Sequence, residues 1–258
     1  MKNSIKFIVG FIIILPVAVL VLWALGKDWL YPQIVPAEFS LKFIQQMVKD
    51  PNFIAALLNS VYIAFAATFL TLIIALPAAK FLAFQHFLPR RFVELIIYLA
   101  LILPGIAIIT SSQTVFLQLR LTGTFTGLIL IHSYFMLPYA LQILLESYRK
   151  MGFGYSETAK VLGATNWQTF TSVTFPLLKP GILAAGNLIY FVSFSQYLPT
   201  FFIGGGRIIT LPMLLLPYAN NGRFGIASSY SLLFLVVSLI AVGLIKKGIG
   251  GKKDGLTT

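Results

Sequence analysis

Long apolar runs constrain the fold of this 258-residue chain more than any other feature. A helix that crosses the core of a bilayer needs about 20 apolar residues. The runs are continuous rather than alternating with a period of two, so they favour helices over the strands of a barrel. With 10% charged residues, against roughly 25% in soluble domains, the chain is predicted to be an all-α integral membrane protein. The six predicted spans cover residues 6–26, 53–84, 92–119, 125–145, 181–202 and 224–245.

The Lys and Arg residues orient these spans. With the amino terminus in the cytoplasm, the segments on that side carry 13 of the 19 Lys and Arg residues, and the opposite side carries the other 6. The positive-inside rule therefore predicts that both termini are cytoplasmic. The net charge of +12 is then a signal of topology, and we expect membrane lipid rather than nucleic acid around the chain.

The first span has a rival interpretation as a cleaved signal peptide, because Lys2 and Lys6 precede its apolar core. Its apolar run, however, exceeds the roughly 7–15 residues of a typical signal-peptide core. We expect a retained membrane anchor.

The external segment that follows, residues 27–50, contains a helical pattern over residues 37–50. Phe39, Phe43 and Met47 are spaced by four, so one face of the expected helix is apolar. Such a helix could lie on the membrane surface or pack on a neighbouring element. The alternative is a gate or docking element for an external partner.

A polar interruption separates the fourth and fifth spans. Ser156 can cap a helix there, and Gly163 is the residue type that ends a helix in the left-handed conformation. Thr165 and Gln168 then fit a capping box at the start of a second helix. The sequence therefore predicts helix, glycine turn and helix on the cytoplasmic side.

The second helix of this interruption has an apolar face, because Trp167 and Phe170 are three residues apart. We expect Pro176 and Pro180 to end it before the fifth span begins. A knob that is apolar on one face is suited to insertion into a cleft of another protein. A plain loop lying on the membrane surface is the alternative.

The spacing within the interruption resembles a known motif. It reads Glu157-x-Ala159-x3-Gly163-x9-Val173-x2-Pro176. This pattern, placed between two spans of a six-helix chain, resembles the "EAA" loop of ABC importer permeases. The order and lengths of the spans resemble that family over nearly the whole chain.

The resemblance implies the type I ABC importer permease fold, with six transmembrane helices in one domain over residues 1–258 and a cytoplasmic coupling loop over residues 146–180. Two positions depart from the usual motif: Thr158 replaces an Ala, and Phe175 replaces a Leu. In that family the loop docks on a cytoplasmic ATPase. The positions implied for docking here are Glu157, Thr158, Ala159, Gly163, Val173 and Pro176.

The same resemblance implies partners and a location. Two cytoplasmic ATP-binding subunits, a second permease subunit that is identical or homologous, and an extracytoplasmic solute-binding protein are expected. The assembly would lie in the bacterial inner (cytoplasmic) membrane and import a small solute. A secondary carrier not driven by ATP is the alternative. It is disfavoured because all seven acidic residues lie near or beyond the ends of spans.

The chain carries no catalytic motif. It lacks the G-x-x-x-x-G-K-[ST] phosphate loop, and the glycine cluster at residues 204–206 is followed by Arg207, which favours an external turn. It also lacks H-E-x-x-H and G-x-S-x-G, and its only histidines are His86 and His132. We therefore predict no enzyme activity, cofactor or metal site, and interpret His132 as a helix-packing residue.

Polar residues gather in the fifth span, where Pro199 interrupts the helix and the backbone near Ser195 is expected to be irregular. This stretch resembles permeases of the polyamine, thiamine and ferric-iron branch, which implies a solute of one of these kinds. Serines that merely bend the helix are the alternative to a lined pathway. The candidate pathway residues are Ser112, Gln113, Asn187, Ser195, Gln196 and Tyr197.

Overall fold

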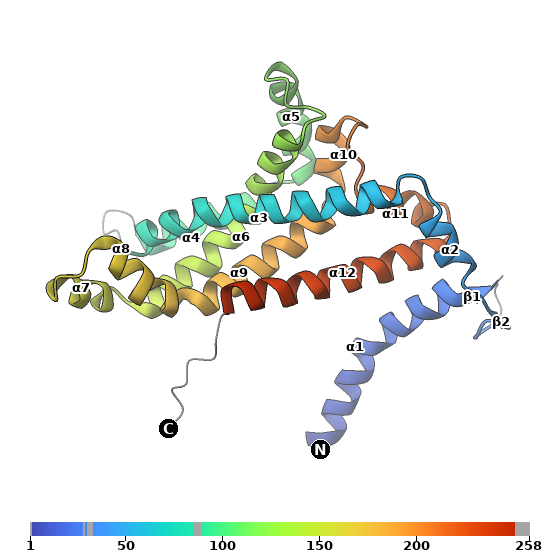
Figure 1. Ribbon diagram of the computed structural model, residues 1–258, viewed down its shortest axis with the longest axis horizontal. Helices are drawn as coiled ribbons and strands as arrows, with labels where there is room; N and C mark the ends of the chain where they lie inside the picture. Colours follow the sequence, from blue (N-terminus) through green and yellow to red (C-terminus); the bar gives the residue numbers. More distant parts are fainter. Residues whose placement is uncertain (1, 28, 30–32, 85–88, 251–258) are drawn as a thin grey trace. The chain divides into compact units, whose positions relative to one another are not determined.

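The apolar runs fold as helices in the computed structural model, which describes residues 2–27, 29, 33–84 and 89–250. A helix satisfies its own backbone N–H and C=O groups, as hydrocarbon requires. The elements (Figure 1) are α1 Lys2–Leu25, β1 Gly26–Lys27, β2 Glu38–Phe39, α2 Lys42–Val48, α3 Phe53–Phe84, α4 Arg90–Ile102, α5 Gly105–Gln118, α6 Phe125–Met151, α7 Gly154–Val161, α8 Asn166–Thr169, the π-helix η1 Phe170–Thr174, α9 Phe175–Ser195, α10 Leu198–Gly204, α11 Leu211–Asn220 and α12 Phe224–Gly250.

Among the described residues, four helices are long and apolar enough to cross a membrane. A shorter apolar helix covers Gly10–Leu25, within the first predicted span. The predictions for the two ends of the chain include residue 1 and residues 251–258, which lie outside the described residues. The four long helices are Phe53–Phe84, Phe125–Met151, Asn166–Ser195 and Phe224–Gly248, and they overlap the second, fourth, fifth and sixth predicted spans.

The third predicted span, residues 92–119, is two helices rather than one. Leu103 has ψ 135° and Pro104 has ψ 113°, so the backbone is extended between α4 and α5. Proline has no N–H to donate and clashes with the carbonyl four residues earlier, and it also pushes the preceding residue out of the helical region.

The chain forms two compact units, and the first comprises Met1–Ser60 and Ile208–Ile240. In this unit β1 pairs antiparallel with β2, so the predicted helix over residues 37–50 is wrong at its start. Phe39 lies in β2 and is exposed, whereas Met47 in α2 is buried. The ring of Phe43 lies against Gly225, where a side chain on the glycine would collide with it.

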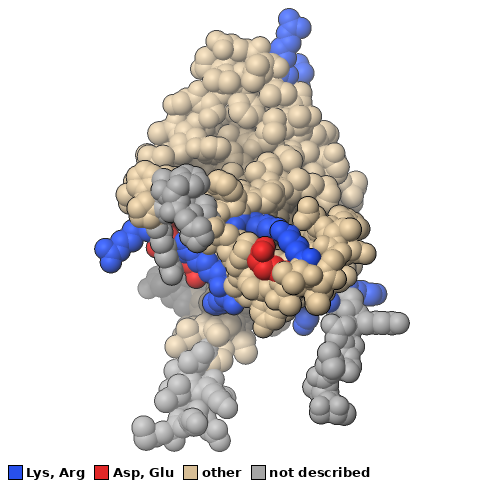
Figure 2. Space-filling view, turned by 90° about the vertical axis from the view of Figure 1, so that its left-hand side faces the viewer, with Lys and Arg blue, Asp and Glu red and all other residues tan. Residues whose placement is uncertain are grey.

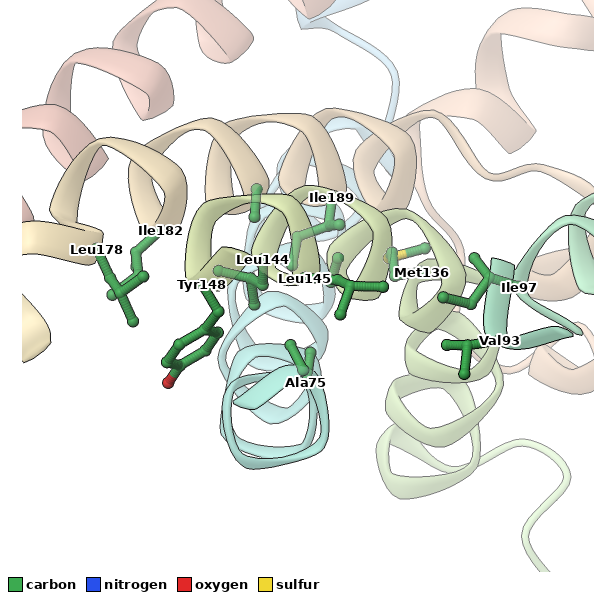
Figure 3. Packing of buried hydrophobic residues seen from close by; sticks show 13 residues of the cluster. Ala75, Val93, Ile97, Met136, Leu144, Leu145, Tyr148, Leu178, Ile182 and Ile189 are labelled. Carbon is green, nitrogen blue, oxygen red and sulfur yellow. The ribbon is translucent and has the colours of Figure 1, made fainter. Parts of the chain in front are cut away.

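The second unit comprises Val61–Arg207 and Ala241–Thr258, and its core lies along α6 and α9. Figure 3 shows the side chains of this core. In a membrane the lipid is as apolar as leucine, so close contact between helices depends on small residues and dense packing. The core residues are Ala75 and Ala79 of α3, Val93 and Ile97 of α4, Met136, Ala140, Leu144, Leu145 and Tyr148 of α6, and Leu178, Ile182, Ala185 and Ile189 of α9.

Large apolar side chains remain exposed along the long helices. On α3, Phe69 and Ile73 are exposed, and on α12 the same is true of Leu239 and Ile240. Apolar surface of this extent is unusual on a protein surrounded by water and fits contact with lipid.

Candidate functional site

The loop between α6 and α9 begins at Gly152 (φ 76°, ψ 165°), which turns the chain out of α6 into α7. The predicted left-handed turn at Gly163 is confirmed, with φ +86°. The N–H of Gly163 donates to the Lys160 carbonyl at 2.9 Å, and the N–H of Ala164 donates to the Ala159 carbonyl at 3.0 Å. These two bonds form a Schellman motif, which satisfies the last carbonyls of α7.

The second helix of the loop begins with the predicted capping box, which is confirmed. Thr165 Oγ1 accepts from the Gln168 N–H at 3.2 Å, and Gln168 Oε1 accepts from the Thr165 N–H at 2.8 Å. Turn and cap together fix the angle between α7 and α8, because each satisfies backbone groups that the bend would otherwise leave unpaired.

Two expectations for this loop are wrong. Ser156 does not cap α7, which begins two residues earlier at Gly154; instead its buried hydroxyl lies 3.5 Å from that of Thr174. Pro176 and Pro180 do not end the second helix, because α8, η1 and α9 run on without a break. Pro176 lies in the first turn of α9, directly after the π-helix η1.

The loop has an exposed apolar tip. Val161 is 86% exposed, Leu162 82% and Trp167 72%. Tyr155 is 61% exposed on the same loop. Several large exposed apolar side chains on one polar segment mark a surface that contacts another protein or a membrane.

Two charged residues of α7 lie close to this tip in the sequence. Glu157 lies in the first turn of α7, and its Oε1 is 3.6 Å from Nζ of Lys160. Figure 2 looks onto the end of the second unit that carries α7 and α8, and it shows Lys and Arg side chains around a small acidic patch. Of the other positions in the predicted coupling motif, Thr158 is exposed, whereas Ala159 and Val173 are partly buried.

An ion cluster at the end of α6, just before the loop, was not predicted from the sequence. Nη1 of Arg149 is 2.8 Å from Oε1 of Glu146 and 2.8 Å from Oε1 of Glu94, which joins α6 to α4. The spacing of Glu146 and Arg149 by three could have indicated the first pair. Nothing local could have indicated Glu94, which is 55 residues from Arg149.

A groove of about 700 Å³ lies beside this cluster, between the end of α6 and the early turns of α9. Glu146, Ser147 and Lys150 of α6 line one wall, and Pro180 and Gly181 of α9 line the other. Its lining mixes apolar and charged groups.

The predicted irregular backbone in the fifth span is present. Helix α9 ends at Ser195, Gln196 is extended with ψ 112°, and α10 begins at Leu198. Ser195 Oγ donates back to the Val192 carbonyl at 3.0 Å, as the helix-bending alternative expected. Gln196 Oε1 is buried and has no hydrogen-bond partner within the described chain.

The other candidate pathway residues are only partly brought together. Gln113 of α5 comes near the break, with Nε2 3.5 Å from the Phe202 carbonyl of α10. Tyr197 stacks on Phe201 with ring centroids 5.5 Å apart. Asn187 lies about two turns before the end of α9, and its buried Oδ1 has no partner among the described residues. Ser112 lies beside Gln113 in α5 and is partly buried.

Over the described ranges, no three His, Asp or Glu side chains come together in a way that could hold a metal ion. His86 lies outside the described residues. The candidate functional features are the exposed apolar tip of the loop and the helix break between α9 and α10.

Residues 71–248 match the protein family described as binding-protein-dependent transport system inner membrane component. The inner membrane ABC transporter permease protein YnjC of Escherichia coli K12 is 28% identical over 204 residues, which cover 78% of this chain and 39% of that protein. The spermidine/putrescine transport system permease protein PotC of Haemophilus influenzae is 24% identical over 250 residues, covering 95% of this chain and 94% of that protein.

Among solved structures, a chain of a bacterial ABC transporter involved in import of the acidic polysaccharide alginate has a TM-score of 0.72. The match covers 95% of this chain and 94% of that one, at 13% identity. At this level of identity the likeness concerns the fold alone.

Proposed function

The chain belongs to the family of binding-protein-dependent transport system inner membrane components, and we propose that it forms half of the pathway of an ATP-driven importer of a small solute. It is a multi-pass permease of the inner membrane. In the proposed topology six segments cross the bilayer, with α4 and α5 together as the third. Both termini and the loop between α6 and α9 lie in the cytoplasm.

The single observation that carries the proposal is the exposed apolar tip of that loop. Val161, Leu162 and Trp167 are mostly exposed, although Trp167 lies beside Phe170 with ring centroids 6.1 Å apart. Burial of each in a groove of an ATPase subunit would contribute about 1.5–3 kcal/mol. Lys160 and Glu157 of α7 add charge complementarity at the rim, which sets orientation more than affinity.

The loop is suited to transmit force because its second helix continues into the membrane. Residues Asn166–Ser195 form one helix of 30 residues. Movement of α8 by a closing ATPase dimer therefore displaces α9, and α9 packs along α6. In this mechanism the ATPase supplies the energy and the helix pair changes the access of the pathway.

The proposed importer also requires partner subunits. One half of a pathway needs a second permease subunit, identical or homologous, and two loops need two ATP-binding subunits. The family description includes dependence on a binding protein, which supports an extracytoplasmic solute-binding partner.

The solute is proposed to pass the broken helix between α9 and α10, where Gln196 and Tyr197 lie. Names of relatives include both a spermidine/putrescine system and a trehalose system. Polyamines are the first solutes to test, because PotC matches nearly the whole chain.

The test is purification of the tagged chain in mild detergent from its native host, followed by mass spectrometry. We expect an ATP-binding subunit and a second permease with the wild type. Leu162→Asp and a Glu157→Ala/Gly163→Ala double variant should lose the ATPase subunit. Ser172→Ala, an exposed change on the same loop, is the matched control. An ATPase subunit that is absent from the wild type under crosslinking would refute the proposal.

A further inference from the structure

A buried polar group in the second unit has no part in the loop. His132 of α6 is 2% exposed, and its two ring nitrogens contact two buried hydroxyls. Nδ1 lies 3.0 Å from Ser193 Oγ, and Nε2 lies 3.1 Å from Thr200 Oγ1. Ser193 is in the last turn of α9 and Thr200 in the first turn of α10, so the ring contacts both sides of the break.

The hydrogen-bond partners assign the protons. Thr200 Oγ1 donates its only proton to the Gln196 carbonyl at 3.0 Å. Its oxygen must then accept from His132, which places the ring proton on Nε2. Nδ1 is left with a lone pair and accepts from the Ser193 hydroxyl. Each buried polar atom of the three side chains has a partner in this arrangement.

One member of the network, Thr200, also bonds the irregular backbone. The Gln196 N–H donates to the Ser193 carbonyl at 3.2 Å, and the Gln196 carbonyl accepts from Thr200. A helix break within a membrane protein persists only where its freed backbone groups find partners inside the protein. At this break the Thr200 hydroxyl supplies that support to the Gln196 carbonyl, and His132 in turn contacts Thr200.

We propose that His132 is a positioning residue, which joins α9 to α10 and thereby holds Gln196 and Tyr197 in place for the passing solute. Gln196 is the residue of the break itself, and its carbonyl is tied to His132 through Thr200. The role in transport rests on the proposed function, whereas the joining of the two helices does not. Broken helices are the usual place for solute contacts in transporters.

The first test needs no transport. The chain has two histidines, His86 and His132, so ¹⁵N-histidine labelling gives two sets of ring signals, and His86→Gln assigns them. We expect His132 in the neutral form with the proton on Nε2. A proton on Nδ1, or a charged ring, would overturn the assignment.

The second test compares variants at one position in the intact complex. Thr200→Val keeps the shape and removes the hydroxyl, and Thr200→Ser keeps the hydroxyl. Ser133→Ala is the control, because Ser133 is a buried neighbour of His132 that bonds the Ala67 carbonyl of α3 instead. Uptake of radiolabelled spermidine, putrescine and trehalose is measured in proteoliposomes with the ATPase and binding-protein subunits.

We expect Thr200→Val to raise the solute concentration for half-maximal uptake about five- to tenfold, the range for one buried hydrogen bond. Thr200→Ser and Ser133→Ala should stay near the wild type, and all variants should retain the ATPase subunit. Equal half-maximal concentrations for Thr200→Val and Thr200→Ser would overturn the positioning role.

A spin label on α10 separates failure of this inference from failure of the proposed function. The sequence has no cysteine, so Leu198→Cys gives one labelling site on an exposed position of α10 and leaves the stacking of Tyr197 on Phe201 intact. We expect a mobile label with Thr200→Val or Ser193→Ala and a restricted one with Thr200→Ser. Unchanged mobility in both disruptive variants would overturn the joining of α9 to α10. Absence of uptake by the wild type would count against the proposed function alone.

Discussion

Gly181 of α9 lies against Ser147 of α6 so closely that a Cβ on the glycine would fall on the serine hydroxyl oxygen. The same Cβ would lie 2.7 Å from the Cβ of Ser147, which cannot rotate away. The hydroxyl donates to the Ile143 carbonyl at 2.7 Å. The small size of Ser147 and Gly181 thus allows α6 and α9 to pack closely together.

We therefore expect Gly181→Ala to destabilise the chain by about 1–3 kcal/mol through overpacking. Thermal unfolding in detergent is the measurement. Gly243→Ala in α12 is the matched control, because a Cβ there meets nothing within 4 Å. Adding Ser147→Gly should restore part of the loss, and a double variant no better than Gly181→Ala would contradict this account.

Gly163→Pro should leave the chain in the membrane and abolish stimulation of the ATPase. Proline cannot adopt φ +86°, and it has no N–H for the bond to the Lys160 carbonyl. The turn between α7 and α8 is then lost, although the long helices keep their contacts. Quantification of the chain in membranes, beside the ATP hydrolysis rate of the purified complex, checks both parts. Gly154→Ala, at an open position of α7, should behave as wild type. Wild-type coupling in Gly163→Pro would show that the turn is dispensable.

Arg149→Met should lower the stability of the second unit, because it removes the cation between Glu94 and Glu146. Hydrogen bonds to charged groups contribute about 1.5–3 kcal/mol, and partial exposure of both carboxylates reduces that figure to about 1 kcal/mol. The unfolding temperature in detergent should fall, and the gap to wild type should narrow in high salt. Lys150→Met, the next residue, is the control. A gap that does not change with salt would indicate that packing rather than charge is lost.

Glu38 should make the pairing of β1 with β2 depend on pH. Lys27 Nζ donates to Glu38 Oε2 at 2.7 Å, and this bond with the charge of Lys27 lowers the pKa of Glu38 below its usual value. A carboxyl whose pKa is lowered on folding stabilises the fold above its unfolded pKa and loses that effect as the pH falls through the folded pKa. The protection of residues 26–27 and 38–39 against hydrogen exchange, taken relative to the intrinsic exchange rate at each pH, should therefore fall only in acid. Glu38→Gln should remove this dependence, and an unchanged acid response in that variant would exclude Glu38 as its source.

The sequence alone determined the long helices and the turn chemistry of the loop. Hydropathy closely located Phe53–Phe84, Phe125–Met151 and Phe224–Gly248, because a helix satisfies its own backbone groups in hydrocarbon. For the fourth long helix, Asn166–Ser195, it identified only the part from residue 181 onward. The glycine turn at Gly163 and the capping box at Thr165 could also be predicted from the sequence, because every hydrogen bond in them joins residues at most five apart.

Only the tertiary structure decided which distant groups meet. His132 bonds partners 61 and 68 residues away, and Arg149 bonds Glu94 across 55 residues. Such pairs depend on the rotation and depth at which helices pack, which no local pattern encodes. The tertiary structure also decided the conformation at Pro180, which was predicted to end a helix but lies within α9. A membrane helix can keep a proline because neighbouring groups satisfy the freed backbone, and those neighbours are set by packing.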